Sequence, residues 1–213
     1  AMNMLRYLTS GESHGQSLIS IIDGLPSNVE LNFDEINAEL KKRQCGYGRG
    51  GRMKIESDKV NILGGVRGKK TLGGPVSIEV KNRDYQNWTE YMAPMDDVDF
   101  ETRKVDNVRP GHADLVGCLK YDFTDARNVL ERSSARETAS RVAVGAICKQ
   151  VLKNFDIDFV SHVIQIGNVK DENVYDFDYI KNNVDSSEVR CANKDMEAKM
   201  IAQIDEIKNE RDT

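Results

Sequence analysis

Four polar blocks, rich in arginine, serine, histidine and glycine, interrupt the short strand and helix patterns of the first 142 residues. They are residues 11–15 (GESHG), 43–52 (RQCGYGRGGR), 109–114 (RPGHAD) and 131–138 (ERSSARET). Glycine allows positive φ and close approach of the backbone to a ligand, and arginine binds a phosphate or carboxylate through two hydrogen bonds. The fold must therefore bring loops together around a multiply anionic ligand.

The patterns between the blocks predict short strands and one early helix. Apolar runs at residues 5–9 and 18–22 flank the first block, which places that block on a loop between two strands. Asn32 and Glu35 have the spacing of a capping box, so a helix is expected to begin there and to deliver the second block at its end.

The middle of the chain changes to short strand-like pieces separated by glycines, at residues 60–63 and 75–80, which is typical of antiparallel sheet. Residues 89–107 are polar and acidic and predict a surface excursion.

The last third of the chain predicts two helices and a strand. Ser134 and Glu137 form a second capping-box pattern, followed by apolar residues at helical spacing as far as Val151. Residues 159–166 alternate like a strand, and a final helix carries Met196, Met200, Ile204 and Ile207 on one side. We therefore expect one α+β domain spanning residues 1–213.

Composition restricts the partners. The net charge of -5 argues against a general nucleic-acid binder, and no carboxylate lies between Glu39 and Glu56, so the positive charge is local. No apolar run is long enough to span a membrane, and the four cysteines show neither zinc spacing nor a disulfide framework. These features favour a cytoplasmic protein without a metal site.

Two of the blocks have competing interpretations. The 43–52 loop suits a small phosphorylated or carboxylated molecule, although a solvated loop or an RNA-contacting arginine-glycine segment has the same composition. Ser134 and Arg132 stand where a helix begins, and the N–H groups and dipole of a helix N-terminus attract phosphate in addition to any capping role.

The chain has three histidines, and two of them lie beside glycines in the polar blocks. His14 and His112 are therefore candidate general acids, whereas His162, in an alternating segment, is expected to belong to the fold. Ser13 adjoins His14, but adjacent side chains of an extended segment point apart, which argues against a Ser/His nucleophile pair.

The four blocks together resemble the chorismate synthase family. The resemblance runs from about Met4 to the end of the chain and rests on residues 10–15 (SGESHG), 43–53 (RQCGYGRGGRM), 109–115 (RPGHADL) and 131–138 (ERSSARET). It implies a β-α-β sandwich, with layers of antiparallel sheet and helices. It also implies 1,4-anti elimination of phosphate from 5-enolpyruvylshikimate 3-phosphate, giving chorismate, with reduced FMN required and no net redox change.

The resemblance also implies roles for individual residues. His14 matches the acid that protonates the departing phosphate, and His112 matches the one that protonates reduced flavin. The implied substrate residues are Ser13, Arg43, Arg49, Arg52, Arg109 and Arg136. The implied FMN residues are Arg132, Ser133 and Ser134, and Arg43 and Arg49 match contacts to NADPH in members that reduce their own flavin.

Family members continue beyond the point that corresponds to Thr213, so the chain is expected to be an N-terminal portion with impaired flavin binding and little turnover. A homotetramer is the assembly that the family implies. The alternatives are a non-catalytic fragment that keeps an anion pocket, an RNA-contacting protein, and an NADPH-dependent flavin reductase.

Overall fold

The computed structural model describes residues 4–49 and 57–212, and a four-stranded antiparallel sheet lies at its centre. The sheet has the order β1-β2-β6-β3 and is formed by β1 (Arg6–Ser10), β2 (Ser17–Asp23), β6 (Val76–Lys81) and β3 (Asn61–Gly64). Two two-stranded ribbons accompany it, β4 (Val66–Arg67) with β5 (Lys70–Thr71) and β7 (Gln165–Ile166) with β8 (Val169–Lys170). The expected strands at 5–9, 18–22, 60–63 and 75–80 are confirmed to within one residue.

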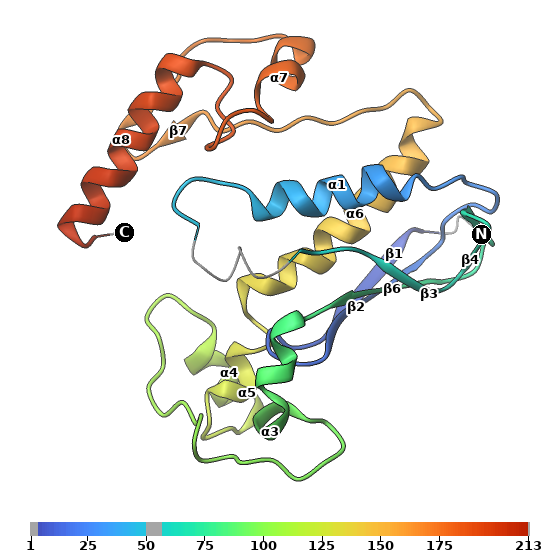
Figure 1. Ribbon diagram of the computed structural model, residues 1–213, viewed down its shortest axis with the longest axis vertical. Helices are drawn as coiled ribbons and strands as arrows, with labels where there is room; N and C mark the ends of the chain where they lie inside the picture. The colour runs from blue at the N-terminus through green and yellow to red at the C-terminus, as the bar shows by residue number, and fades with distance from the viewer. Residues whose placement is uncertain (1–3, 50–56, 213) are drawn as a thin grey trace.

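The long helix α6 (Thr138–Lys153) packs against one face of this sheet, and α1 (Phe33–Gln44) packs alongside α6 in the same core (Figure 1). Leu18 pairs with Val80 and Ile22 with Val76, and all four side chains are buried between the sheet and the helices. Burying a Leu, Ile or Val side chain contributes about 1.5–3 kcal/mol. This two-layer core confirms the α+β class with antiparallel sheet and helices in layers.

The first capping box is half correct. Asn32 Oδ1 accepts a hydrogen bond from the Glu35 backbone N–H at 3.1 Å, so α1 begins where expected. Glu35 does not return the bond, because its carboxylate accepts from Gln150 and Lys153, and the Asn32 N–H donates to Gln150 instead. Contacts with α6 therefore replace the local bond.

The second helix also begins where expected but by another geometry. Ser134 Oγ accepts from the Arg136 N–H at 3.2 Å and opens a 3₁₀ turn, η2 (Ala135–Glu137), which leads into α6. The Glu137 carboxylate accepts from Thr9 and Arg141, so its part of the predicted capping box is wrong.

Four short helical elements gather below the sheet in Figure 1: η1 (Arg83–Asn87), α3 (Thr89–Met92), α4 (Asp114–Tyr121) and α5 (Arg127–Leu130). The surface excursion expected over residues 89–107 begins with the short helix α3. Its remaining residues, 93–107 of the described chain, form neither helix nor strand, in agreement with that expectation. Gly117 of α4 packs on Val129 of α5 so closely that a Cβ would lie 2.3 Å from Val129 Cγ1.

The C-terminal part forms a smaller packed unit at the other end of the sheet-and-helix layer (Figure 1). It contains α7 (Phe177–Asn183) and α8 (Lys194–Glu210), with Met200, Val189 and Cys191 in its buried cluster. The final helix is confirmed, and the assignment of residues 1–213 to one domain stays a prediction.

The strand expected over 159–166 is wrong except at β7. Over residues 159–164 the backbone bonds are isolated, such as Val163 N to Arg190 O and Asp171 N to Ile164 O, and no ladder forms there in the described chain. Phe159 and Ile164 are half exposed. Alternation alone does not make a strand when no partner strand runs alongside.

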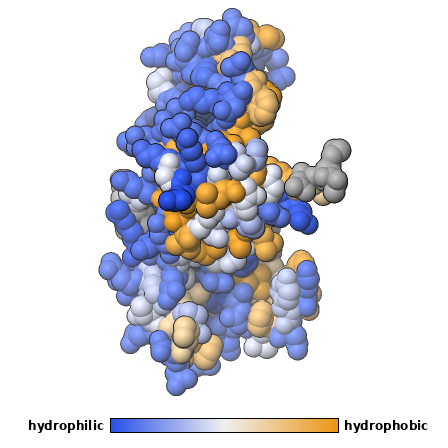
Figure 2. All heavy atoms as spheres, turned by 90° about the vertical axis from the view of Figure 1, so that its right-hand side faces the viewer, coloured by the Kyte–Doolittle hydropathy of each residue, from blue (hydrophilic) through white to orange (hydrophobic). Residues whose placement is uncertain are grey.

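Apolar side chains remain on the surface of the sheet-and-helix layer. Figure 2 shows them gathered at the middle of one face, with hydrophilic side chains prevailing at both ends. None of the described helices combines the length and the apolar character needed to cross a membrane.

Candidate active site

The first polar block is a tight loop between β1 and β2, as expected. Gly11 has a φ of +106°, and a Cβ there would lie 2.4 Å from the Ser17 carbonyl oxygen, so this position requires glycine. The buried Asn82 amide donates to the carbonyl oxygens of Glu12 and Gly15 at 3.0 and 2.8 Å. The loop that carries Ser13 and His14 is therefore held at both ends.

Ser13, His14, Arg127 and Glu131 form what we call the His14 cluster. Ser13 Oγ donates to Glu131 Oε2 at 2.7 Å, and His14 Nδ1 lies 2.9 Å from both carboxylate oxygens. Arg127 donates to Glu131 Oε1 at 2.7 Å. Glu131 is buried, whereas the His14 side chain is 18% exposed, so the ring lies at the edge of the core.

The expectation that Ser13 and His14 point apart is wrong. The segment is a turn and not an extended strand, and Ser13 Oγ lies 3.1 Å from His14 Nδ1. Both side chains converge on Glu131. The serine hydroxyl is buried and donates to that carboxylate, an arrangement that does not present it as a nucleophile.

Burial and hydrogen bonding act in opposite directions on Glu131. Burial alone raises the pKa of a carboxyl group, but the hydrogen bonds from His14 and Ser13 and the charge of His14 outweigh it and lower the Glu131 pKa from 4.5 to about 2. The cluster therefore contains a permanent negative charge at neutral pH.

An aromatic platform lies against His14. The Trp88 ring centroid is 3.9 Å from that of His14, with an interplanar angle of 32°. Arg103 lies over both Trp88 and Tyr91, with its guanidinium carbon 3.9 and 4.6 Å from the ring centroids. Such cation–π contacts hold the indole in place.

A cavity of about 260 Å³ opens beside this cluster. It is lined by polar and charged side chains of the loop, of the α5 segment and of the 93–107 segment, and by three aromatic rings. These residues are Glu12, Arg127, Asn128, Glu131, Arg103, Tyr91, Phe100 and Phe123. A site with this lining can hold a small polar molecule against one apolar wall.

Arg109, His112 and Asp114 form a second group, the His112 cluster, at the start of α4. His112 Nδ1 lies 2.7 Å from Asp114 Oδ1, and Arg109 Nε donates to Asp114 Oδ2 at 3.0 Å. Hydrogen bonding from Arg109, opposed by burial, lowers the pKa of Asp114 from 3.8 to about 2. The Asp114 side chain is buried, while that of Arg109 is 51% exposed.

Arg43, Asp58 and Arg136 form a third group, the Asp58 cluster. Arg136 donates from two nitrogens to the two oxygens of Asp58, at 2.6 and 2.8 Å, and both side chains are buried. Arg43 lies 3.7 Å from the same carboxylate and donates to Thr138 Oγ1 and the Ala135 carbonyl. Asp58 thus binds two of the arginines that were expected to bind substrate.

The Asp58 and His14 clusters are connected. Arg136 Nε donates to Asn82 Oδ1 at 3.0 Å, and the amide of Asn82 holds the 11–15 loop. The α5 segment connects the His14 cluster to the His112 cluster. Val129 of α5 packs on α4, which begins at Asp114, and Glu131 follows two residues later. Residues 127–138 therefore link all three clusters.

The expected FMN residues lie on this linking segment. Arg132 donates to the carbonyl and hydroxyl oxygens of Thr9 at 2.9 and 2.7 Å, and its Nη1 is buried with no hydrogen-bond partner among the described residues. Ser133 is exposed and donates to the Val129 carbonyl, and Ser134 caps η2.

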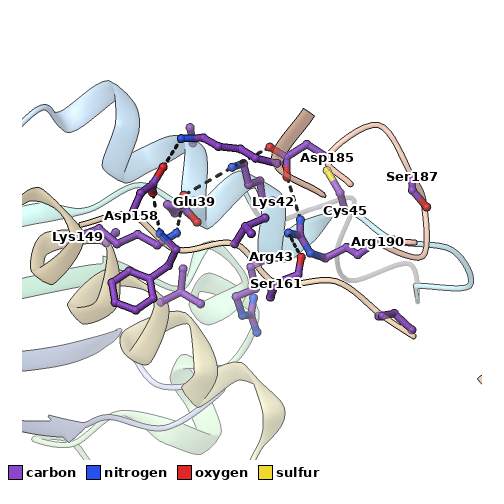
Figure 3. A pocket seen from close by; sticks show the side chains of 18 of the residues that line it. Glu39, Lys42, Arg43, Cys45, Lys149, Asp158, Ser161, Asp185, Ser187 and Arg190 are labelled. Atoms are coloured by element: carbon purple, nitrogen blue, oxygen red, sulfur yellow. Dashed lines mark hydrogen bonds and ion pairs between the residues drawn. The ribbon is translucent and has the colours of Figure 1, made fainter. Parts of the chain in front are cut away.

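A much larger groove, of about 1260 Å³, lies between the α1–α6 layer and the C-terminal unit. Arg43 and Arg49 line this groove. His14 and His112 are not among the described residues that line it. Many of its charges pair with one another, as Lys42 does with Asp185 (Figure 3). Arg52 lies outside the described residues, so its expected role stays a prediction.

Sequence reasoning did not indicate three side chains that organise these clusters, the carboxylates of Glu131 and Asp58 and the ring of Trp88. Glu131 stands inside the fourth block, where a buried acid next to candidate ligand residues was a possible signal. Asp58 and Trp88 carry no comparable signal, since only the fold brings them to Arg136 and His14.

Comparison with known proteins gives one family. The family model described as chorismate synthase matches residues 5–213. A chorismate synthase of Alkaliphilus metalliredigens is 54% identical over 211 residues, covering 99% of this chain and 55% of that protein. One from Staphylococcus epidermidis is 51% identical over 213 residues, covering 98% and 55%.

A solved structure agrees. A crystal structure of chorismate synthase matches with a TM-score of 0.73 and 38% identity, over 98% of this chain and 55% of that one. The chain thus spans about half the length of the curated relatives it matches.

Proposed function

The chain belongs to the chorismate synthase family, and on that premise we propose that it supplies the substrate-binding and proton-transferring part of a phosphate lyase. The substrate proposed is 5-enolpyruvylshikimate 3-phosphate and the product chorismate. The observation that carries the proposal is that both motif histidines, His14 and His112, rest with Nδ1 on a buried carboxylate.

This arrangement suits proton transfer. In the elimination the bond between carbon and the phosphate oxygen breaks, a proton leaves C6, and a new double bond forms. A histidine whose Nδ1 donates to a carboxylate exchanges protons through Nε2. We assign His14 to the departing phosphate and His112 to proton transfer at the cofactor.

The arginines supply the complementary charge. Arg109 is half exposed beside His112, and Arg49 is exposed in the groove, so both can reach an anion. Arg136 and Arg43 are engaged with Asp58, and Ser13 with Glu131, so these three support the substrate proposal by fixing the site's shape.

The family's cofactor is reduced FMN, and the residues present fit part of it. The Arg132 Nη1 atom is buried and lacks a hydrogen-bond partner among the described atoms, although it lies 3.7 Å from the Glu137 carboxylate, and Arg132 stands two residues before the Ser134 cap of η2. We propose that Arg132, Ser133 and Ser134 hold FMN there. Reduced FMN, when bound, lends electron density to the substrate as phosphate departs.

We extend the proposal to NADPH at Arg43 and Arg49, which line the same groove. The homotetramer that the family implies stays a prediction, which the molar mass in solution tests.

The test is chorismate formation under anaerobic conditions with chemically reduced FMN. His14→Ala and His112→Ala are each expected to lower kcat by about 10²–10⁴-fold, the usual contribution of general acid–base catalysis. His162→Ala is the matched control, because His162 contacts Tyr175 and lies in neither cluster.

Calorimetric titration with the substrate provides a second measurement for the chain by itself. Substrate binding that weakens in Arg109→Met supports the proposal even if this length of chain turns over slowly. Absence of both binding and turnover, or turnover that survives both histidine variants, contradicts it.

A further inference from the structure

Glu131 is the buried carboxylate against which His14 rests, and it is among the most enclosed side chains of the described molecule, with 2% of its surface exposed. It follows α5 directly, and its carbonyl oxygen accepts from the Ser13 N–H at 2.9 Å. A charged carboxylate at such a position requires partners, because burying an unpaired charge is costly.

All of the contacts described for this carboxylate come from donors. Oε2 accepts from the Ser13 hydroxyl at 2.7 Å and from the His14 backbone N–H at 2.8 Å, and Oε1 accepts from Arg127 at 2.7 Å. An ionised carboxylate only accepts hydrogen bonds. The His14 Nδ1 atom, 2.9 Å from both oxygens, must therefore carry a proton.

The ring has little freedom to turn away from this contact. The Trp88 ring packs against the imidazole, with a centroid distance of 3.9 Å and a tilt of 32°, and Asn82 holds the backbone on both sides of His14. With Nδ1 committed to Glu131, Nε2 is the ring atom available for proton exchange.

We propose that Glu131 is a positioning residue for His14, fixing the proton on Nδ1 and directing Nε2 to the reacting group. The inference rests on the proposed function only for the identity of that group.

The order of the three side chains distinguishes this arrangement from a nucleophilic triad. In a triad the hydroxyl donates to the ring nitrogen opposite the one that the carboxylate holds. Here the Ser13 hydroxyl lies on the Nδ1 side and donates to Glu131, so it supports the carboxylate instead.

The direct test is the tautomer of His14, measured by ¹⁵N NMR of the imidazole rings at alkaline pH. The chain has only three histidines, so single-histidine variants assign every ring. The proposal requires His14 to carry its proton on Nδ1. A ring protonated on Nε2 in the unmodified protein overturns it without any further variant.

Glu131→Gln is the decisive substitution, because the amide N–H can donate to Nδ1 and so favour the other tautomer. We expect the ratio of Nδ1-H to Nε2-H to fall about tenfold or more, as befits loss of a charge-assisted hydrogen bond. Glu137→Gln is the matched control, because Glu137 binds Thr9 and Arg141 and should leave the His14 tautomer unchanged.

Ser13→Ala separates positioning from general loosening of the loop. This variant removes a hydrogen bond to Glu131 but keeps the carboxylate, so the Nδ1-H tautomer should persist. An equal shift in Ser13→Ala and Glu131→Gln overturns the proposal, as does an unchanged tautomer in Glu131→Gln. If Glu131→Gln does not fold, the unmodified protein and Ser13→Ala still decide.

Kinetics test the functional consequence separately. Where turnover is measurable, Glu131→Gln should lower kcat at least tenfold with KM changed less than threefold, because the substrate contacts remain. Equal loss in both parameters contradicts a positioning role. If no variant turns over, the proposed function is in question, whereas the tautomer result still decides the role of Glu131.

Discussion

The two histidine clusters have the same chemistry but are built in opposite ways. His112 finds its carboxylate two residues away, at Asp114, whereas the partner of His14 is Glu131, 117 residues along the chain. Both carboxylates are buried, and the pKa of each is lowered to about 2. The difference is that the His112 cluster is local and the His14 cluster depends on the fold.

Solvent reaches the clusters differently as a result. Arg109, the main partner of Asp114, is 51% exposed, but Arg127, beside Glu131, is 17% exposed. Water can replace Asp114 as a partner of Arg109, and it cannot readily do so for the donors around Glu131. The His14 cluster should therefore be coupled to stability much more strongly.

Removing the carboxylates should show the largest difference. We expect Glu131→Ala to lower the free energy of unfolding by about 3 kcal/mol, because it leaves a mostly buried guanidinium and hydroxyl without their acceptor. Asp114→Ala should cost about 1 kcal/mol, since Arg109 is solvated. Urea denaturation measures both, and equal losses would show that the two clusters are not distinguished by burial.

Acidification should affect both clusters in the same direction. The unfolded carboxyl groups take up protons near pH 4, while the folded ones, with pKa values of about 2, do not, so the unfolded state binds more protons. Stability from these groups is present above about pH 4.5 and is lost as the pH falls toward 2.

Glu131→Gln should reduce the loss of stability at low pH more than Asp114→Asn does, because the pKa of Glu131 is lowered from 4.5 and that of Asp114 only from 3.8. Urea midpoints measured between about pH 5 and 2 give the dependence of stability on pH. An equally steep dependence in both variants and in the unmodified protein would place the acid sensitivity elsewhere.

The smallest expected effect is optical. Trp88 is the only tryptophan of the chain, and its ring centroid lies 3.9 Å from that of His14. His14→Ala removes the ring that packs against the indole, so the fluorescence of Trp88, measured without cofactor, should change in this variant. His112→Ala should leave the emission unchanged; the reverse pattern would reject the contact between Trp88 and His14.

Much of the fold followed from local patterns in the sequence. Residues 18–22 form an apolar run, residues 75–80 alternate, and Asn32 and Ser134 mark the helix starts; each of these effects acts within a few residues. The strand expected at 159–164 fails for the complementary reason. A strand needs a partner, and the sequence around Phe159 does not say whether one runs beside it.

The sequence by itself determined the family, the loop position of His14 and His112, and the local carboxylate Asp114, which lies within the same motif. Only the tertiary structure decided that Glu131 lies under His14, that Trp88 covers it and that Asp58 binds Arg136. The physical reason is that motif spacing fixes neighbours over a few residues, whereas burial of distant segments in one core chooses the partners that a charged group must have.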